Sequence, residues 1–318
     1  GNVQRDGFVD MTRAIRSPGS ALKPFLYGLG FAAGIIRPST NVADFPSNFG
    51  AYEPNDYNDR YMGVVTATTA LRRSLNVPAV DLIEAYGPLR FAAHLRAAGT
   101  QLLLPYGADP ALPLALGGAG ISMRRLLALY AGLANDGVVE RLHLIAGQHR
   151  RARRLLSPYA AEDVTAILNR SFPFGGPGGI AWKTGTSAGN RDDWAMGYNH
   201  RYAAAVWIGQ PNGAALPGDT ALAAIPILAK VFSILPGQPI DIHPTTRSLT
   251  LQRQPMGTLL EIASPAPGSQ LTVGEPGSIR IIGGNRPFHF LLDGRPLDSN
   301  PALRSVDWTP AVAGFYQL

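Results

Sequence analysis

The stretch Ile180-Ala-Trp-Lys-Thr-Gly-Thr-Ser187 follows a run of chain breakers, Phe172-Pro-Phe-Gly-Gly-Pro-Gly-Gly179. From this point on, apolar and polar residues alternate, as is typical of β-strands. We therefore predict three successive antiparallel strands at residues 180–187, 193–198 and 202–209. Lys183 and the Thr-Gly-Thr that follows it then lie on the first of these strands.

The chain before the breakers is predicted to be mainly helical. Apolar residues recur at helical spacing in residues 64–85, 89–98, 122–135 and 158–169. A further helix that begins at Gly19-Ser20 has apolar residues on more than one face, which predicts that it is buried at the centre. Residues 37–61 are rich in Pro, Asn, Asp and Tyr and are expected to form an irregular loop, and residues 221–234 are expected to form a closing helix.

Lysine is rare in this chain, and its placement indicates chemistry. Only three lysines occur among the 28 basic residues, and two of them lie in Ser20-Ala-Leu-Lys23 and Lys183-Thr-Gly-Thr186. Burial and nearby cations can make a lysine amine neutral and proton-accepting, whereas an arginine stays charged. A serine three residues before a lysine, at the start of a helix, shares a helical face with it. We predict that Ser20 is a nucleophile and Lys23 is its base.

A third element, Ser74-Leu-Asn76, lies between these two motifs in the chain. On its own it would be interpreted as a turn or a helix cap. In the order Ser-x-x-Lys, Ser-x-Asn and Lys-Thr-Gly, however, it completes the motif set of active-site serine enzymes that react with penicillin. We expect Ser74 and Asn76 to pass the proton towards the leaving group. Lys183 is expected to remain charged, to favour the neutral form of Lys23 and to attract a substrate carboxylate.

The residues around Lys183 are predicted to bind the substrate. Thr184 and Thr186 offer hydroxyl groups to the carboxylate, and Gly185 has no side chain to obstruct a substrate that lies along the strand. Ser187 is assigned to the same substrate-binding stretch. The backbone N–H groups of Ser20 and Thr186 are candidates for an oxyanion pocket, because a helix start and a strand edge present unpaired donors.

The composition excludes several other classes of protein. The 318 residues are 46% hydrophobic and 16% charged, which is typical of a folded globular chain with room for two domains. The net charge of +6 is spread along the chain, so nucleic acid is not an expected partner; the basic cluster at residues 149–154 is interpreted as solvated. There is no cysteine, and the six histidines show no paired metal-ligand spacing, so neither a metal nor a cofactor is expected. The longest apolar stretch, at about residues 25–36, is too short to be a membrane segment.

A second domain is predicted after Leu235-Pro-Gly-Gln-Pro239, which is interpreted as a linker. Short apolar runs separated by Pro and Gly turns predict strands at residues 258–262, 278–282, 288–292 and 314–318. We therefore expect two domains, at residues 1–235 and 237–318, of which the second is a small β-sandwich.

At these motifs the chain resembles the transpeptidase domain of class A penicillin-binding proteins. The resemblance covers about residues 5–235 and is carried by Arg16-Ser-Pro-Gly-Ser-Ala-Leu-Lys-Pro-Phe25 and by Lys183-Thr-Gly-Thr-Ser187 with Arg191-Asp192. It implies an α+β fold of the penicillin-binding and serine β-lactamase type, with a helical part and an antiparallel sheet. The residues from about 237 onwards resemble the small β domain that follows the transpeptidase in one subgroup.

The resemblance implies a peptidoglycan D,D-transpeptidase. Its serine is acylated by the D-alanyl-D-alanine end of one stem peptide, an amine of another stem peptide takes the acyl group, and β-lactam antibiotics trap the serine. The implied location is periplasmic, on a full-length protein anchored in the inner membrane. Other cell-wall synthesis proteins are possible partners of the second domain.

Members of this family carry a membrane anchor, a glycosyltransferase domain and further sheet strands before the nucleophile. Only nineteen residues precede Ser20 here. We therefore expect a fragment with about three of the five sheet strands, and whether it is active by itself is not predicted. The second domain is expected to end within its last strand.

Two alternatives remain open at this stage. A serine β-lactamase would share Ser20, Lys23 and the Lys-Thr-Gly strand, but it needs a base that activates water for deacylation. No glutamate lies between Glu84 and Glu140 to take that role, so a long-lived acyl-enzyme is expected. The other alternative is a non-enzymatic penicillin-binding or cell-wall scaffold protein, against which the complete set of three motifs argues.

Overall fold

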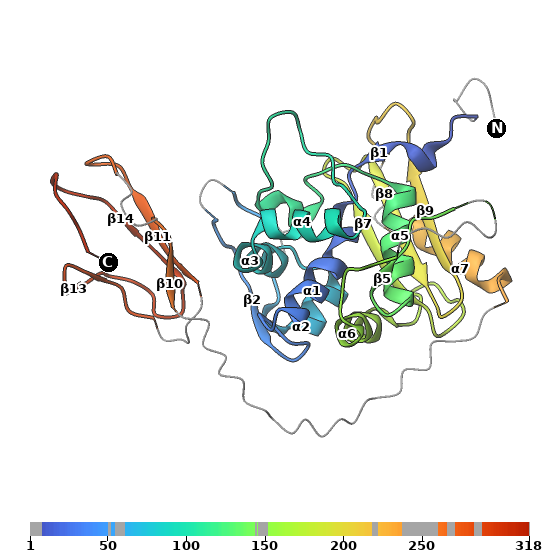
Figure 1. Ribbon diagram of the computed structural model, residues 1–318, viewed down its shortest axis with the longest axis horizontal. Coiled ribbons are helices and arrows are strands. Elements are labelled where there is room, and N and C mark those ends of the chain that lie inside the picture. Colours follow the sequence, from blue (N-terminus) through green and yellow to red (C-terminus); the bar gives the residue numbers. More distant parts are fainter. Residues whose placement is uncertain are drawn as a thin grey trace. The chain divides into compact units, whose positions relative to one another are not determined.

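The computed structural model describes residues 8–49, 52–54, 61–143, 145, 152–217, 222–236, 260–265, 271–282 and 288–317. The chain divides into two compact units, Gly1–Pro244 and Thr245–Leu318 (Figure 1). Residues 237–239 of the expected linker lie outside the described residues.

The first unit contains an antiparallel sheet with the strand order β7-β8-β9. Its strands are β7 (Ala181–Thr186), β8 (Asp192–Tyr198) and β9 (Ala203–Gly209). The three strands predicted after the glycine-rich run are therefore confirmed, each with bounds within one residue of the prediction. In this register Thr186 lies opposite Asp193, and Gly185 lies opposite Trp194.

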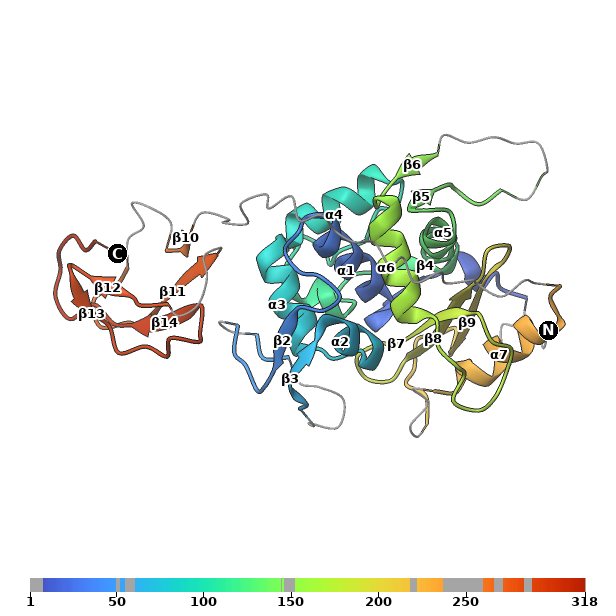
Figure 2. The same ribbon diagram turned by 90° about the horizontal axis from the view of Figure 1, so that it is seen from below.

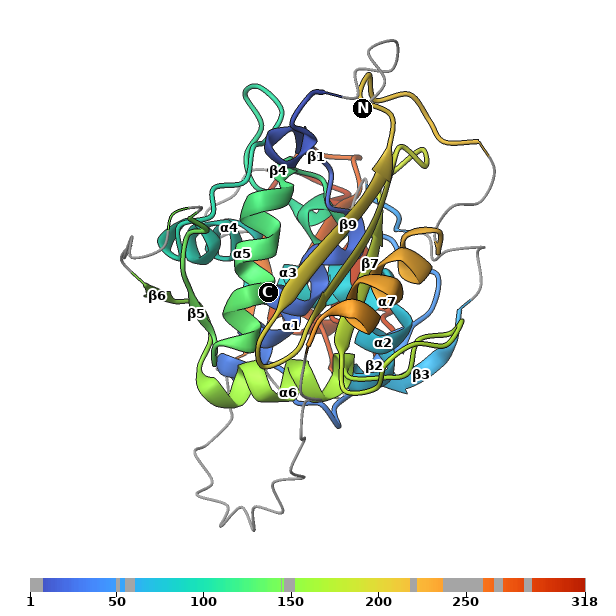
Figure 3. The same ribbon diagram turned by 90° about the vertical axis from the view of Figure 1, so that its right-hand side faces the viewer.

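Apolar side chains pack against both faces of the sheet; β8 is buried along its whole length, whereas the residues of β9 are partly exposed. Helix α7 (Ala224–Ile234) packs on one face, where Phe172, Trp182 and Ala195 join its apolar side chains. Trp194 and Met196 face the main core on the other side. Figure 3 shows α7 and the long helix α5 (Met123–Ala134) on opposite faces of the sheet.

The helical half surrounds one central helix. The described helices of this half, besides α5, are η3 (Gly19–Leu22), α1 (Lys23–Ala32), α2 (Ala67–Arg73), α3 (Val77–Tyr86), α4 (Pro88–Ala97), η5 (Leu112–Leu116) and α6 (Pro158–Leu168). Figure 2 shows α1 in the middle of α2, α3, α4 and α6. Its residues from Lys23 to Gly30 are buried, as expected of a helix that is apolar all round. None of the helices in the described part of the chain is both long and apolar enough to cross a membrane.

The predicted helices are confirmed in type, with changes at two places. The stretch at residues 64–85 forms two helices, α2 and α3, separated at residues 74–76. The central helix also starts differently. The residues from Gly19 to Leu22 form a 3-10 turn, and the α-helix begins at Lys23. Pro24 lies in the first turn of α1, where a missing N–H breaks no intrahelical hydrogen bond.

The prediction of an irregular loop at residues 37–61 is wrong in its first part. Strand β2 (Asn41–Asp44) pairs with β3 (Gly63–Thr66), and α2 therefore begins at Ala67 rather than at residue 64. The Asp44 carboxylate is buried and accepts a hydrogen bond from the Met62 N–H, which fixes the pairing. Such a four-residue ribbon is held by contacts that no local periodicity reveals.

Five further short elements lie in the described part of the first unit. They are the 3-10 helix η2 (Met11–Arg13), the pair β1 (Ile15–Arg16) with β4 (Ile121–Ser122), and the pair β5 (Val138–Val139) with β6 (Arg153–Arg154). The rest of the basic cluster, residues 149–151, lies outside the described residues.

The described residues of the second unit form two small antiparallel sheets. The first contains β10 (Glu261–Ser264), β11 (Gly277–Ile282) and β14 (Ser305–Trp308), and the second contains β12 (Leu291–Leu292) and β13 (Arg295–Pro296). Ile279, Ile281, Phe288, Phe290 and Val306 form its core.

The strand predicted at 278–282 is confirmed, and the one at 288–292 is reduced to Leu291–Leu292. Residues 258 and 259 of the first predicted strand lie outside the described residues. The strand predicted at 314–318 is wrong: residues 314–317 are irregular, and Tyr316 instead packs edge-on against Trp308. The third strand of the sheet is β14, which the sequence analysis missed.

Candidate active site

Glycines bring three segments of backbone into contact at the site. A Cβ atom at Gly185 would lie 2.3 Å from the Pro18 carbonyl oxygen, and one at Gly19 would lie 2.2 Å from the Thr186 carbonyl oxygen. A Cβ at Gly117 would lie 2.3 Å from the Gly19 nitrogen. The turn that carries Ser20 therefore packs directly against β7, and only residues without a Cβ permit this approach.

This packing changes the role predicted for Gly185. The sequence predicts that the missing side chain of Gly185 leaves room for the substrate, but its Cβ position points at Pro18 and Ala21 of the Ser20 turn. Gly185 is thus required for packing between β7 and η3. The prediction considered only the outer side of the strand, because the sequence does not show what covers the inner side.

The loop Ser74-Leu-Asn76 encloses the amine of Lys23. Lys23 is fully buried, and its Nζ donates to the carbonyl oxygens of Ser74 (2.6 Å) and Leu75 (2.8 Å) and to Asn76 Oδ1 (2.6 Å). Ser74 ends α2 in the left-handed conformation, with φ 65°, and α3 begins at Val77. The loop is therefore the sharp connection between two helices, folded around a buried cation.

Lys183 reaches the same loop from the sheet. Its amine is also fully buried, and its Nζ donates to Ser74 Oγ at 2.7 Å and to the Thr184 carbonyl at 2.8 Å. Ser74 thus contacts Lys23 through its carbonyl and Lys183 through its hydroxyl. The structure brings together Lys23, Ser74, Asn76 and Lys183, which come from all three predicted motifs.

The electrostatics of the lysine pair differ from the expectation. Burial lowers the pKa of Lys183 well below its ordinary value, and the neighbouring charges of Lys23 and then Arg170 lower it further. Lys23 Nζ donates to oxygen acceptors of the Ser74 loop, whereas a neutral Lys183 amine has a lone pair that can accept a proton from the Ser74 hydroxyl. The sequence predicts that Lys183 keeps its charge, but its position in the interior favours the neutral amine.

Ser20 lies in the 3-10 turn immediately before Lys23 and is partly exposed. Three side chains that the sequence analysis did not select hold this turn. Tyr130 Oη donates to the Ala21 carbonyl at 2.9 Å, Ser17 Oγ donates to the Gly117 carbonyl at 2.7 Å, and Trp194 Nε1 donates to the Ser17 carbonyl at 2.9 Å. The sequence spacing of these three residues does not predict that they support the turn, because they come together only in the folded chain.

The predicted substrate-binding residues fall into two groups. Thr184 and Thr186 lie on β7 and are partly exposed. Ser187 is buried, and its Oγ accepts a hydrogen bond from the Asp192 N–H at 2.9 Å. The Ser187 side chain therefore closes the turn between β7 and β8.

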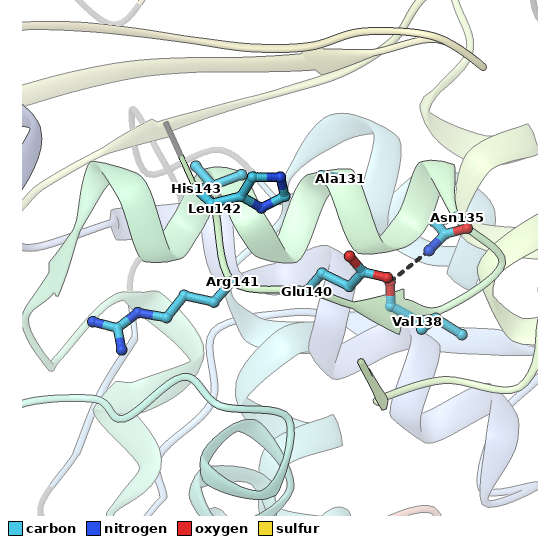
Figure 4. A pocket seen from close by; sticks show the side chains of 7 residues that line it. All are labelled: Ala131, Asn135, Val138, Glu140, Arg141, Leu142 and His143. Carbon is cyan, nitrogen blue, oxygen red and sulfur yellow. Dashed lines mark hydrogen bonds between the residues drawn. The ribbon is translucent and has the colours of Figure 1, made fainter. Parts of the chain in front are cut away.

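A cavity of about 290 Å³ lies elsewhere, between α5 and β5 (Figure 4). Its lining residues are Ala131, Asn135, Val138, Glu140, Arg141, Leu142 and His143, none of which is a predicted site residue. Across it, Asn135 Nδ2 donates to the Val138 carbonyl. The described residues contain no group of three or more histidine or acidic side chains that could hold a metal ion.

Comparison with known proteins agrees with this geometry. A family model described as the penicillin binding protein transpeptidase domain matches residues 8–231. Penicillin-binding protein 1C of Escherichia coli (strain K12) is 43% identical over 240 residues, covering 73% of this chain and 31% of that protein. Penicillin-binding protein 1F of Bacillus subtilis (strain 168) is 28% identical over 222 residues, covering 62% and 30%. The chain thus spans less than a third of the length of these relatives.

Among solved structures, that of the PonA1 protein from Mycobacterium tuberculosis in complex with penicillin V has a similar fold. Its TM-score is 0.62 at 22% sequence identity, covering 74% of this chain and 73% of that chain. The likeness extends over most of the chain and agrees with the matched range of the family model. This chain belongs to the transpeptidase domain family of penicillin-binding proteins.

Proposed function

We propose that this chain is the acyl-transferring part of a peptidoglycan D,D-transpeptidase, with Ser20 as the nucleophile. One observation supports the proposal: the buried amines of Lys23, on α1, and Lys183, on β7, both hydrogen-bond to Ser74. Lys23 directly follows the turn that presents Ser20. A buried amine next to a second cation gives up its proton more easily, which is what a base for a serine hydroxyl needs.

In the proposed first step, Ser20 Oγ attacks the carbonyl carbon between the last two D-alanines of a stem peptide. A C–O bond forms and the C–N bond breaks. The hydroxyl proton of Ser20 passes through the network of Lys23, Ser74 and Lys183 to the departing D-alanine amine. In the second step an amine of another stem peptide attacks the ester, and Ser20 recovers a proton. A β-lactam follows only the first step, because its leaving amine stays tethered to the acyl group.

The remaining residues have supporting roles in this proposal. Asn76 holds the amine of Lys23 through its side-chain oxygen, and Thr184 and Thr186 bind the terminal carboxylate of the donor. The N–H groups of Ser20 and Thr186 form the oxyanion pocket. We place this chemistry outside the cytoplasm, where the peptidoglycan substrate lies.

The test is labelling with a fluorescent penicillin. Wild-type protein is expected to carry a stable label, and Ser20→Ala is expected to carry none. Ser233→Ala is the matched control, because Ser233 is exposed on α7 and its hydroxyl only donates to the Lys230 carbonyl. Equal labelling of the wild-type protein and Ser20→Ala would refute the proposal.

The fate of the label separates the alternatives. Loss of the label within seconds would indicate a β-lactamase. If wild-type protein and Ser20→Ala support cross-linking of stem peptides equally, the chain acts as a binding or scaffold protein instead.

A further inference from the structure

Arg170 lies in the connection between α6 and β7 and contacts the elements on both sides of the site. Its guanidinium packs 3.8 Å from the centre of the Trp182 ring, and its Nη1 donates to the Arg72 carbonyl at 2.7 Å. In return, Trp182 Nε1 donates to the Arg170 carbonyl at 2.9 Å. None of the three sequence motifs includes this arginine.

The two residues that Arg170 joins are next to site residues. Arg72 lies in the last turn of α2, two residues before Ser74, and Trp182 directly precedes Lys183 on β7. The contact between Ser74 Oγ and Lys183 Nζ therefore lies just beyond the point where Arg170 bridges the two elements. A movement of α2 away from β7 would have to break the Arg170 contacts first.

Arg170 forms no ion pair with an acidic side chain of the described residues. Its Nε has no hydrogen-bond partner among them either. Burial and then Arg72 and Arg73 lower the pKa of Arg170 to about 10, so the group remains charged at neutral pH.

Lys183 experiences this charge together with others. Lys23 of α1 and Arg170 are the cations that act on it. The acidic groups on the elements packed against β7 are Glu162 and Asp163 of α6 and Asp192 and Asp193 of β8. Asp193 lies opposite Thr186, at the far end of β7 from Trp182.

We propose that Arg170 is a positioning residue for acylation: it clamps the end of α2 to β7, so that the Ser74 hydroxyl meets the Lys183 amine, and it adds a fixed positive charge near that amine. The inference rests on the proposed function, in which this amine belongs to the proton network.

The direct test is the titration of Lys183 in Arg170→Gln. Because the chain has only three lysines, a protein labelled with ¹⁵N at lysine Nζ gives few signals, and Lys183→Met identifies the one that matters. Removing the positive charge is expected to raise the Lys183 midpoint by about 0.5–1 pH unit. The acid limb of the penicillin labelling rate should move upwards in pH by the same amount.

Two further variants keep the test decisive. Arg125→Gln is the matched control, because Arg125 is also a partly buried arginine that donates to a backbone carbonyl, that of Gln101. Arg170→Lys retains the charge but cannot stack and donate as a planar guanidinium does. It should keep the wild-type midpoint and label several-fold more slowly.

The inference is overturned if the Lys183 midpoint in Arg170→Gln equals that in Arg125→Gln, or if Arg170→Lys labels at the wild-type rate. If Arg170→Gln does not fold, the labelling rate of Arg170→Lys decides the clamp. Failure of the proposed function has a different signature: wild-type protein would carry no label on Ser20, while the lysine titration would still report the effect of Arg170.

Discussion

A methyl group at position 185 would lie 2.3 Å from the Pro18 carbonyl oxygen and 2.7 Å from the Ala21 nitrogen. Both atoms belong to backbone, so neither can move aside as a flexible side chain would. We expect Gly185→Ala to destabilise the first unit by about 1–3 kcal/mol and to slow penicillin labelling, because β7 and the Ser20 turn must separate. Urea denaturation and the labelling rate measure the two effects.

Gly178→Ala is the control for this substitution. Gly178 lies in the same glycine-rich approach to β7, but a Cβ there meets nothing within 4 Å. A Gly185→Ala protein that is as stable and as reactive as Gly178→Ala would contradict the described packing.

Lys183 should make the stability of the protein depend on pH. Because its pKa is lowered in the folded state, the unfolded chain binds more protons between that lowered pKa and the ordinary value of 10.5. The free energy of unfolding should therefore rise with pH in this interval and fall as the pH drops through the lowered pKa. Urea denaturation between pH 7 and about 9.5 measures the slope.

Two lysine variants isolate this effect. In Lys183→Met the slope should flatten, whereas Lys230→Met should retain it, because Lys230 is exposed on α7. The same slope in both variants would show that another group causes the pH dependence.

At the scale of elements, α5 positions the Ser20 turn through one hydroxyl. Tyr130 is buried and donates to the Ala21 carbonyl of η3. Tyr130→Phe leaves that carbonyl without its partner, so we expect a loss of about 1–2 kcal/mol in unfolding free energy and slower labelling. Tyr106→Phe, in which the ring is fully exposed, is the control. Wild-type values in Tyr130→Phe would exclude this positioning role.

Part of the fold and of the site can be predicted from local sequence patterns. Helices such as α5 and α6 and the strands of the central sheet follow from local periodicity, and the order of the three motifs identified the lysines that the fold brings together. Strands β2 and β14 and the turn-closing role of Ser187 depend on partners distant in the chain or across a turn. The protonation of Lys183 could not be predicted for a related reason, because its burial is a property of the assembled core.

At the scale of the whole molecule, all predicted site residues lie in the unit Gly1–Pro244. The family match, residues 8–231, falls within the same unit. We expect a chain that ends at Pro244 to fold and to be labelled by penicillin at the wild-type rate, because this unit has its own core. A large decrease in the rate of penicillin labelling on removal of residues 245–318 would show that the site needs the second unit.

The residue to which penicillin attaches shows whether Ser20 is the nucleophile. Wild-type protein is treated with penicillin, its intact mass is measured, and the modified residue is located by peptide fragmentation. We expect a single penicilloyl adduct on Ser20, because the lysine pair and the glycine contacts lie at the turn that carries it. An adduct on any other residue, or no adduct on correctly folded protein, would contradict it.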